Sequence, residues 1–321
     1  MDAGRFAAPT GHRSTRPTRT AKLCVQPMIM PPVLTHPDKL LWSEPPVTKE
    51  KFLHYLEHVW PAMRPFLTGR QLTVVRWPHG IDGPSFFQKN CPDYAPDFIR
   101  TSARDGTNYI VCDDARTLLW LGNQSALEYH IPFQKAEADR PEELVFDLDP
   151  PSRADFLLAV KAARELKRIF DQLGLGSVPK LTGSRGIQIH LPLGRSGPSY
   201  AETRLFASFV ARAVVERFPA DFTTERLKKN RGDRLYIDYV QHAPGKTVIC
   251  PYSPRGKRGA PVAAPLFWEE VREGLAMADF TMDTVLRRLA AGINPFSDYF
   301  RLENASFSQI VTSLKQAQWQ G

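Results

Sequence analysis

The chain has 321 residues, 42% of them hydrophobic and 11% aromatic, which is enough for one large core or for two lobes that share a cleft. Its formal net charge of +8 and its isoelectric point near 9.3 favour a polyanionic partner without naming one. No apolar run approaches the roughly eighteen residues of a membrane span, and the four dispersed cysteines form no CxxC pair, so neither a disulfide framework nor a zinc knuckle is supported. We expect a soluble protein of a reducing cytoplasm.

The beginning of the chain differs in composition from the rest. Residues 1–27 are rich in Arg, Thr, Pro and Gly and show no apolar period, so we predict a disordered basic tail. A start at Met28 or Met30 is an alternative, because both precede the first segment that reads as structured. Residues 28–321 are expected to form one unit of two lobes.

The first regular elements are a helix and a short strand. Apolar side chains recur at helical spacing over residues 48–67, where Thr48 can serve as the N-cap. A strand is predicted at 72–77. The proline-rich segment 84–100, which contains two adjacent phenylalanines, reads as a loop.

A second helix is predicted after the alternating segment 144–150. Side chains of this strand divide between two faces, with Leu144, Phe146 and Leu148 on one and Val145, Asp147 and Asp149 on the other. Ser152 and Asp155 suggest a capping box at the start of the following helix, and Gly174 can end it.

Further strands are predicted around the turn within residues 178–193 and at residues 234–240, with a helix at about 201–217 between them. The mixture of strands and helices indicates an α/β or α+β fold. The sequence contains no internal repeat.

Two aspartates carry the clearest chemical signal. Asp147 and Asp149 lie at i and i+2 of a strand, so their carboxylates point to the same side roughly 6.5 to 7 Å apart. Such hard oxygen ligands favour Mg²⁺ or Mn²⁺. The alternative is a pair of surface aspartates on an edge strand. Asp238, in another apolar strand, would complete a three-carboxylate site for two cations about 3.5 to 4 Å apart if the strands are neighbours.

Two basic regions could contact phosphate. The turn at 182–186, TGSRG, combines hydroxyls, a cation and glycines that allow backbone amides to approach a ligand. It lacks the spacing of a Walker loop, and a tight hairpin is the alternative. Residues 226–258 contain nine Lys or Arg and two carboxylates, which indicates either a phosphate-binding surface or a solvated basic face.

The ordered series of motifs resembles the polymerase domain of bacterial end-joining ligase D, a branch of the archaeo-eukaryotic primase superfamily. The series comprises FFQKN from residue 86, LEYH from 127, VFDLDP from 145, TGSRGIQ from 182, IDY from 237, PYSPR from 251 and GAPV from 259. It covers most of the chain. The resemblance implies that residues 28–321 are a primase-polymerase domain, with a primase-type core of mixed and antiparallel sheets flanked by helices.

The resemblance also implies residue roles. The catalytic metal ligands would be Asp147, Asp149 and Asp238; the nucleotide contacts His130, Thr182, Ser184, Arg185, Gln188, Arg231 and Arg255; and the DNA contacts Lys39, Lys49, Phe86, Phe87 and Lys89. The two phenylalanines would stack on template bases, and Lys39 and Lys49 would hold a 5′-phosphate. For His130 and for the phenylalanine pair, the alternative is a structural role. For the two lysines, the alternative is that they are solvated surface residues.

The activity implied is template-dependent nucleotidyl transfer that fills gaps and extends ends in non-homologous end joining. It would proceed through two Mn²⁺ or Mg²⁺ ions, with a preference for ribonucleotides. The implied partners are NTPs, DNA ends or gaps with a 5′-phosphate, Ku, and a separate ATP-dependent ligase, since the sequence has no KxDG motif. The expected location is the bacterial cytoplasm at the nucleoid. One departure is Gln188, where family members commonly have His.

Two other functions fit parts of the sequence. A strand ending in DxD is also the nucleophile motif of haloacid-dehalogenase-like phosphatases, but Pro150 and Pro151 follow at once, and that motif leaves Asp238 unexplained. A non-catalytic DNA-end-binding module fits the charge and the aromatic pair. It does not explain three aspartates on strands, because acids beside a phosphate surface repel DNA unless metals intervene.

Overall fold

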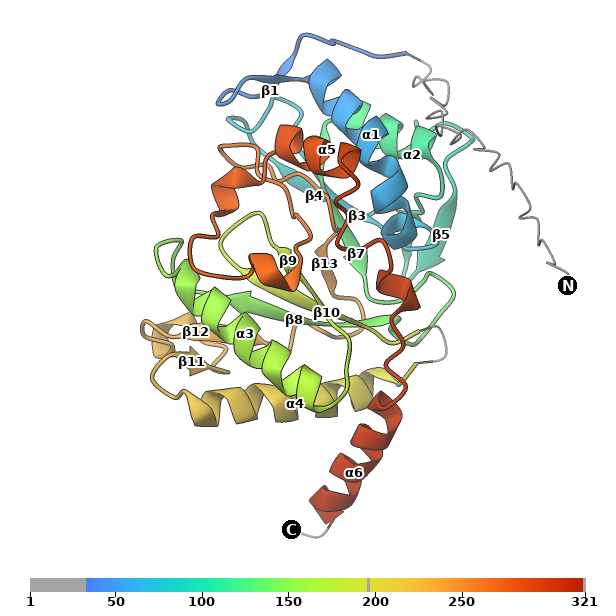
Figure 1. Ribbon diagram of the computed structural model, residues 1–321. Helices are drawn as coiled ribbons and strands as arrows, with labels where there is room; N and C mark the ends of the chain where they lie inside the picture. The colour runs from blue at the N-terminus through green and yellow to red at the C-terminus, as the bar shows by residue number, and fades with distance from the viewer. Residues whose placement is uncertain (1–32, 195–196, 320–321) are drawn as a thin grey trace, which may run out of the picture.

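A computed structural model describes residues 33–194 and 197–319 (Figure 1). The tail predicted for residues 1–27 lies outside the described residues. Two sheets organise the fold, one of five strands and one of four. Within the described residues, no helix is long and apolar enough to cross a membrane.

The five-stranded sheet has the order β11-β12-β8-β10-β9. Its strands are β8 (Glu143–Asp149), β9 (Val178–Leu181), β10 (Ile187–Pro192), β11 (Phe222–Thr223) and β12 (Leu235–Asp238). The helices beside it are α3 (Phe156–Gln172), α4 (Tyr200–Arg217) and, against α4, α6 (Phe307–Trp319). Phe146 of β8 contacts Phe170 of α3 with ring centroids 5.5 Å apart, so the apolar face of β8 is buried under this helix.

The four-stranded sheet has the order β13-β7-β3-β4. Its strands are β3 (Thr73–Arg76), β4 (Phe86–Gln88), β7 (Ala126–Pro132) and β13 (Thr247–Ile249). The helices α1 (Lys49–Leu67), α2 (Ala115–Asn123) and α5 (Met282–Ala290) pack in this part of the molecule, and two small hairpins flank it, β1 (Leu40–Trp42) with β2 (Val47–Thr48) and β5 (Thr101–Arg104) with β6 (Thr107–Ile110).

The helix boundaries follow local chemistry. The Thr48 hydroxyl accepts the Lys51 amide and caps α1, as predicted. Gly174, at φ +65°, follows the last turn of α3, also as predicted. The capping box at Ser152 was wrong. Its hydroxyl accepts from the Ala154 amide and donates to Asp155 Oδ2, forming a turn, and the helix begins only after Asp155.

The segment 84–100 is not entirely loop, because it contains β4. This strand pairs with β3 so that Val75 lies opposite Phe87. The side chains of Phe86 and Phe87 are 46% and 70% exposed. They are therefore outside the core, contrary to the structural alternative considered for them.

Candidate active site

Two neighbouring strands, β8 and β12, bring the three predicted aspartates together. In the antiparallel pairing of β8 with β12, Asp147 lies opposite Asp238, and Asp149 lies opposite Tyr236. The backbone amide of Gln241 donates to Asp238 Oδ1 at 2.8 Å and fixes that carboxylate. The alternative of two isolated surface acids does not hold, because β8 is a central strand of its sheet.

The electrostatics of this cluster fit a divalent cation. Burial, and then the neighbouring charges of Asp149 and Asp238, raise the pKa of Asp147 to about 7. Crowded carboxylates of this kind lose their mutual repulsion when a cation lies between them. The donor set consists of hard oxygens, which suits Mg²⁺ or Mn²⁺.

Two arginines already approach one of these carboxylates. Arg185 donates from Nε and Nη2 to the two oxygens of Asp149, at 2.6 and 2.7 Å. Arg231 Nη1 lies 3.8 Å from Asp149 Oδ2, and its guanidinium stacks on Tyr236 at 3.8 Å from the ring centroid. Cationic groups thus occupy the place that a metal ion would take on Asp149.

A cavity of about 530 Å³ opens between the two sheets at this point. Its lining comprises Phe87, His130, Asp147, Asp149, Thr182, Ser184, Arg185, Gly186, Gln188, Gln241, Thr247, Val248, Ile249, Arg255 and Lys257. Eight of the ten residues predicted for catalysis or nucleotide contact are in this set. Asp238 lies beside it on β12, and Arg231 reaches it through Asp149.

The turn between β9 and β10 is built for close approach. A Cβ on Gly186 would lie 2.1 Å from the Leu148 carbonyl oxygen, so only glycine fits. The Thr182 hydroxyl accepts the amides of Ser184 and Gly186 at 3.2 and 3.1 Å. These two amides therefore shape the turn, while the side chains of Ser184, Arg185 and the adjacent Lys257 line the cavity.

Glu128, which was not predicted as a site residue, holds His130 and Arg255 together. Its Oε2 contacts His130 Nε2 at 3.0 Å, and its Oε1 accepts from Arg255 Nε and from the Gly256 amide, each at 3.0 Å. Burial would raise the pKa of Glu128, but the hydrogen bond from His130 and the charge of Arg255 outweigh it and lower the pKa to about 2. The i, i+2 spacing of Glu128 and His130 was the available signal.

Of the residues predicted to contact DNA, only Phe87 lines this cavity. Phe86, Phe87 and Lys89 are exposed on and after β4, and Phe87 lies 6.3 Å from the His130 ring. Lys39 and Lys49 are neighbours through the β1–β2 hairpin, where the Lys49 amide donates to the Lys39 carbonyl. Lys49 is 3% exposed, so it is not a solvated surface lysine.

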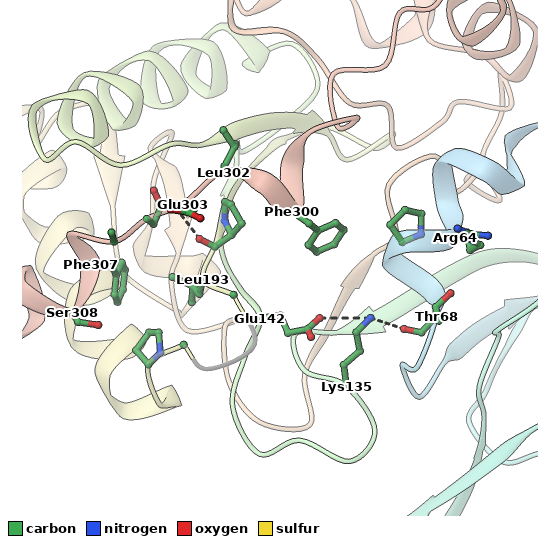
Figure 2. Close-up of a pocket in the computed structure, with 17 residues that line it drawn as sticks. Arg64, Thr68, Lys135, Glu142, Leu193, Phe300, Leu302, Glu303, Phe307 and Ser308 are labelled. Carbon is green, nitrogen blue, oxygen red and sulfur yellow. Dashed lines mark hydrogen bonds and ion pairs between the residues drawn. The ribbon is translucent and has the colours of Figure 1, made fainter.

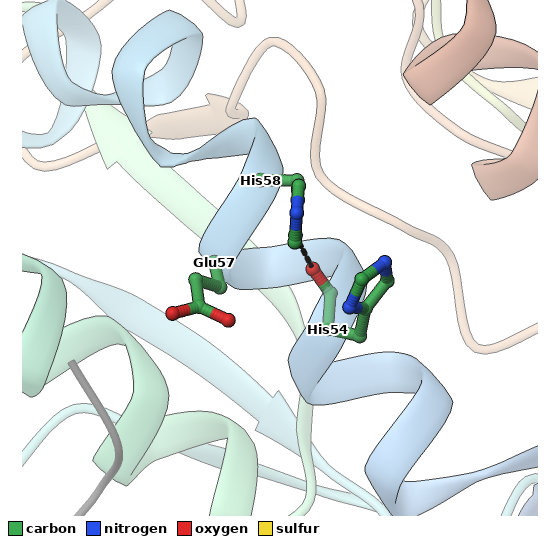
Figure 3. Close-up of side chains that lie close together, drawn as sticks. All are labelled: His54, Glu57 and His58. Carbon is green, nitrogen blue, oxygen red and sulfur yellow. Dashed lines mark hydrogen bonds between the residues drawn. The ribbon is translucent and has the colours of Figure 1, made fainter. Parts of the chain in front are cut away.

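Two other features lie apart from the aspartates. A larger cavity of about 830 Å³ is lined by α1 and the C-terminal segment, and Figure 2 shows its Lys135 between Glu142 and Thr68. On the surface of α1, the side chains of His54, Glu57 and His58 cluster, and His58 Nδ1 donates to the His54 carbonyl (Figure 3). Neither set includes a residue that lines the aspartate cavity.

The site combines adjacent carboxylates and basic side chains between two sheets, with an exposed aromatic pair beside them. This combination defines the class of the protein, a polymerase-type nucleotidyltransferase. Residues 48–296 match the family model described as LigD, primase-polymerase domain, and the chain belongs to this family. The polymerase domain of Mycobacterium tuberculosis ligase D in complex with DNA superposes with a TM-score of 0.78 at 30% identity. That match covers 84% of this chain and 98% of that one.

Two longer relatives place the domain in context. The chain is 50% identical over 280 residues to the bifunctional non-homologous end joining protein LigD of Bacillus subtilis, covering 87% of this chain and 46% of that protein. It is 34% identical over 270 residues to the multifunctional non-homologous end joining DNA repair protein LigD of M. tuberculosis, covering 80% of this chain and 35% of that protein. The chain thus spans less than half the length of these relatives. Family membership sets aside the phosphatase and the non-catalytic module.

Proposed function

We propose that this domain adds nucleotides to DNA ends and gaps under template direction during non-homologous end joining, with a preference for ribonucleotides. The observation that carries the proposal is the set of three carboxylates on β8 and β12, two of which, Asp147 and Asp149, line a cavity together with cationic side chains. Such a site can bind a metal-bound triphosphate, because the carboxylates bind the metal ions and the cationic side chains bind the phosphates.

The metal ligands in this proposal are Asp147, Asp149 and Asp238. Two bound Mn²⁺ or Mg²⁺ ions would lower the pKa of the primer 3′-hydroxyl and neutralise the triphosphate as pyrophosphate leaves. Gln188, opposite Asp147 on β10, orients the Asp147 carboxylate through its amide.

The cationic side chains bind and orient the triphosphate. Arg185, which donates to both oxygens of Asp149, would be free to bind phosphate oxygens when a metal ion neutralises that carboxylate. Arg231, Arg255, Thr182 and Ser184 complete the nucleotide contacts. Glu128 fixes His130 and Arg255 in place, since it accepts from both.

DNA lies along the exposed aromatic strand in this proposal. Phe86 and Phe87 offer two exposed rings for stacking on template bases, and Lys89 follows them in the chain. Lys39 and Lys49 converge on the 5′-phosphate at the far side of a gap. Ku and an ATP-dependent ligase are the partners, and the site of action is the nucleoid in the cytoplasm.

One assay tests the function. A 5′-phosphorylated gapped duplex is incubated with the protein, each nucleotide type and either Mn²⁺ or Mg²⁺, and the primer is resolved on a gel. We expect templated addition of one or a few nucleotides, stronger with ribonucleotides and abolished by a chelator. Addition that ignores the template base, or no metal-dependent addition at all, would contradict the proposal.

A further inference from the structure

Four polar side chains form a row across the five-stranded sheet. The strand registers place Lys180 of β9 opposite Gln188 of β10, Gln188 opposite Asp147 of β8, and Asp147 opposite Asp238 of β12. Cross-strand partners share one face of a sheet. A lysine, whose pKa burial lowers to about 7, therefore stands at one end of the row, two carboxylates stand at the other, and a neutral amide lies between them.

The contact between Lys180 and Gln188 fixes the direction of the amide. Lys180 Nζ lies 2.7 Å from Gln188 Oε1 and 3.2 Å from the Ile249 carbonyl oxygen. A lysine ammonium can only donate, so the Gln188 atom that it meets must be the oxygen. The amide nitrogen is left for Asp147, the cross-strand neighbour of Gln188 on β8, and an N–H directed at that carboxylate favours its ionised form.

The position of Lys180 is costly for the fold. Its side chain is fully buried, and both of its hydrogen bonds go to neutral oxygens. Burying an ammonium without an ion pair is unfavourable, whereas an apolar side chain of similar length would fill the space without that cost. A functional role that methionine could not perform would explain why a lysine is buried here.

We propose that Lys180 is a positioning residue for the metal site, because by holding Gln188 Oε1 it keeps the amide N–H of Gln188 on Asp147. This inference rests on the proposed function, in which Asp147 is a metal ligand. Without Lys180 the amide of Gln188 can rotate and present its oxygen to the carboxylate, which repels it and misdirects it.

The test measures Mn²⁺ binding to the protein alone, by electron paramagnetic resonance, without nucleotide or DNA. Lys180→Met is expected to weaken Mn²⁺ binding by about 10-fold to 100-fold, the usual effect of losing a group that orients a ligand. Thermal unfolding is followed in parallel. If Lys180→Met does not fold, Lys180→Gln takes its place, since it keeps an N–H donor but no longer dictates the amide direction, and a smaller loss is expected.

A double-mutant cycle separates this role from general packing. In a Gln188→Met background, the change at Lys180 should have no further effect on Mn²⁺ affinity, because the amide through which it acts is gone. His190→Gln is the matched control. His190 is buried on the same strand and face but pairs with Glu143, so this variant should lose stability and keep its Mn²⁺ affinity.

Two results would overturn the inference. One is wild-type Mn²⁺ affinity in a folded Lys180 variant, and the other is additive losses in the cycle. Template-directed extension by the wild-type protein is measured separately. Failure of that extension would count against the proposed function, whereas an unchanged Mn²⁺ affinity beside normal extension would count against the role of Lys180 alone.

Discussion

Arg185 donates two hydrogen bonds, of 2.6 and 2.7 Å, to the carboxylate of Asp149. A residue proposed to contact the nucleotide is thus paired with a residue proposed to bind the metal. Bidentate pairing of this kind is among the stronger charge-assisted contacts. Both side chains are about one-third exposed, which weakens the pair by solvent screening. The Arg185–Asp149 pair can therefore compete with a metal ion for the Asp149 carboxylate, and it can also dissociate when a metal ion binds.

This competition leads to a prediction for Arg185→Gln. Removing the guanidinium should tighten Mn²⁺ binding to the nucleotide-free protein by about threefold to tenfold, the equivalent of about 1 kcal/mol. The same change should raise the KM for the nucleotide, because a phosphate contact is lost. Calorimetric titration with Mn²⁺ and steady-state extension kinetics check the two effects. Weaker Mn²⁺ binding by the variant would show that Arg185 does not compete for Asp149.

The three aspartates are expected to be essential for catalysis but not for folding. Asp147→Ala, Asp149→Ala and Asp238→Ala should each abolish nucleotide addition and leave DNA binding largely intact, because each removes a metal ligand. Circular dichroism and gel-shift assays provide the controls. Robust extension by the Asp147→Ala protein would refute the assignment of the metal site.

Asp147 should also give the metal-free protein a characteristic pH dependence. Its pKa is raised from the ordinary 3.8 to about 7, so the folded protein retains a proton that the unfolded chain releases. This proton favours the folded state at low pH, and the benefit is lost as the pH rises from about 4 through about 7. We expect the Tm of the metal-free protein to fall over this range, and saturating Mn²⁺ to reverse the fall.

Asp147→Asn supplies the control for this dependence. An amide does not titrate, so the Tm of the variant should change less with pH than that of the parent protein. The comparison is made in chelator-treated samples at constant ionic strength. A parallel decline in both proteins would assign the pH dependence to other groups.

Some residues of this site could be predicted from the sequence and others could not, for physical reasons. The alternation in β8 identified the shared face of Asp147 and Asp149, because the period of a strand is fixed by its backbone. It could not show that β12 pairs with β8, since neighbours in a sheet are set by tertiary packing. Buried polar groups such as Glu128 and Lys180 were missed for the same reason, as a polar residue on a strand usually indicates a solvated face.

The start of α3 shows a similar limit at the local scale. Ser152 and Asp155 match the spacing of a capping box, but their side chains close a turn before the helix. Pro150 and Pro151 precede this turn, and the residue before a proline is driven toward extended backbone. The predicted capping box was therefore wrong, because these side chains bond to each other in a turn that lies before the helix start.

The exposed phenylalanines should contribute to DNA binding. Replacing Phe86 and Phe87 by Ala should weaken template binding by about 1 to 3 kcal/mol per stacked base. Because both rings lie outside the core, the Tm should change little. Fluorescence anisotropy with labelled single-stranded and gapped DNA measures the loss. Unfolding of the double variant would instead show that the rings support the fold.

Recognition of a break should depend on Lys39 and Lys49. Burial, and then the charge of Lys39, lowers the pKa of Lys49, so a negative charge near these lysines is favourable. Lys49 Nζ donates to the neutral Thr35 Oγ1 at 3.3 Å. A terminal 5′-phosphate carries more negative charge than an internal diester, so it is favoured most beside these lysines.

We therefore expect the Lys39→Ala, Lys49→Ala double variant to extend a 5′-phosphorylated gap only as well as an unphosphorylated one, with little change on open template-primer DNA. Higher salt should reduce the wild-type preference, because the contact is electrostatic and screened. Lys51→Ala is the matched control, since this lysine lies in the first turn of the same helix, is exposed and pairs with Asp283. Both gapped substrates are titrated with all three proteins at two salt concentrations. If the double variant keeps the wild-type preference for the phosphorylated gap, these lysines are structural and the 5′-phosphate is bound elsewhere.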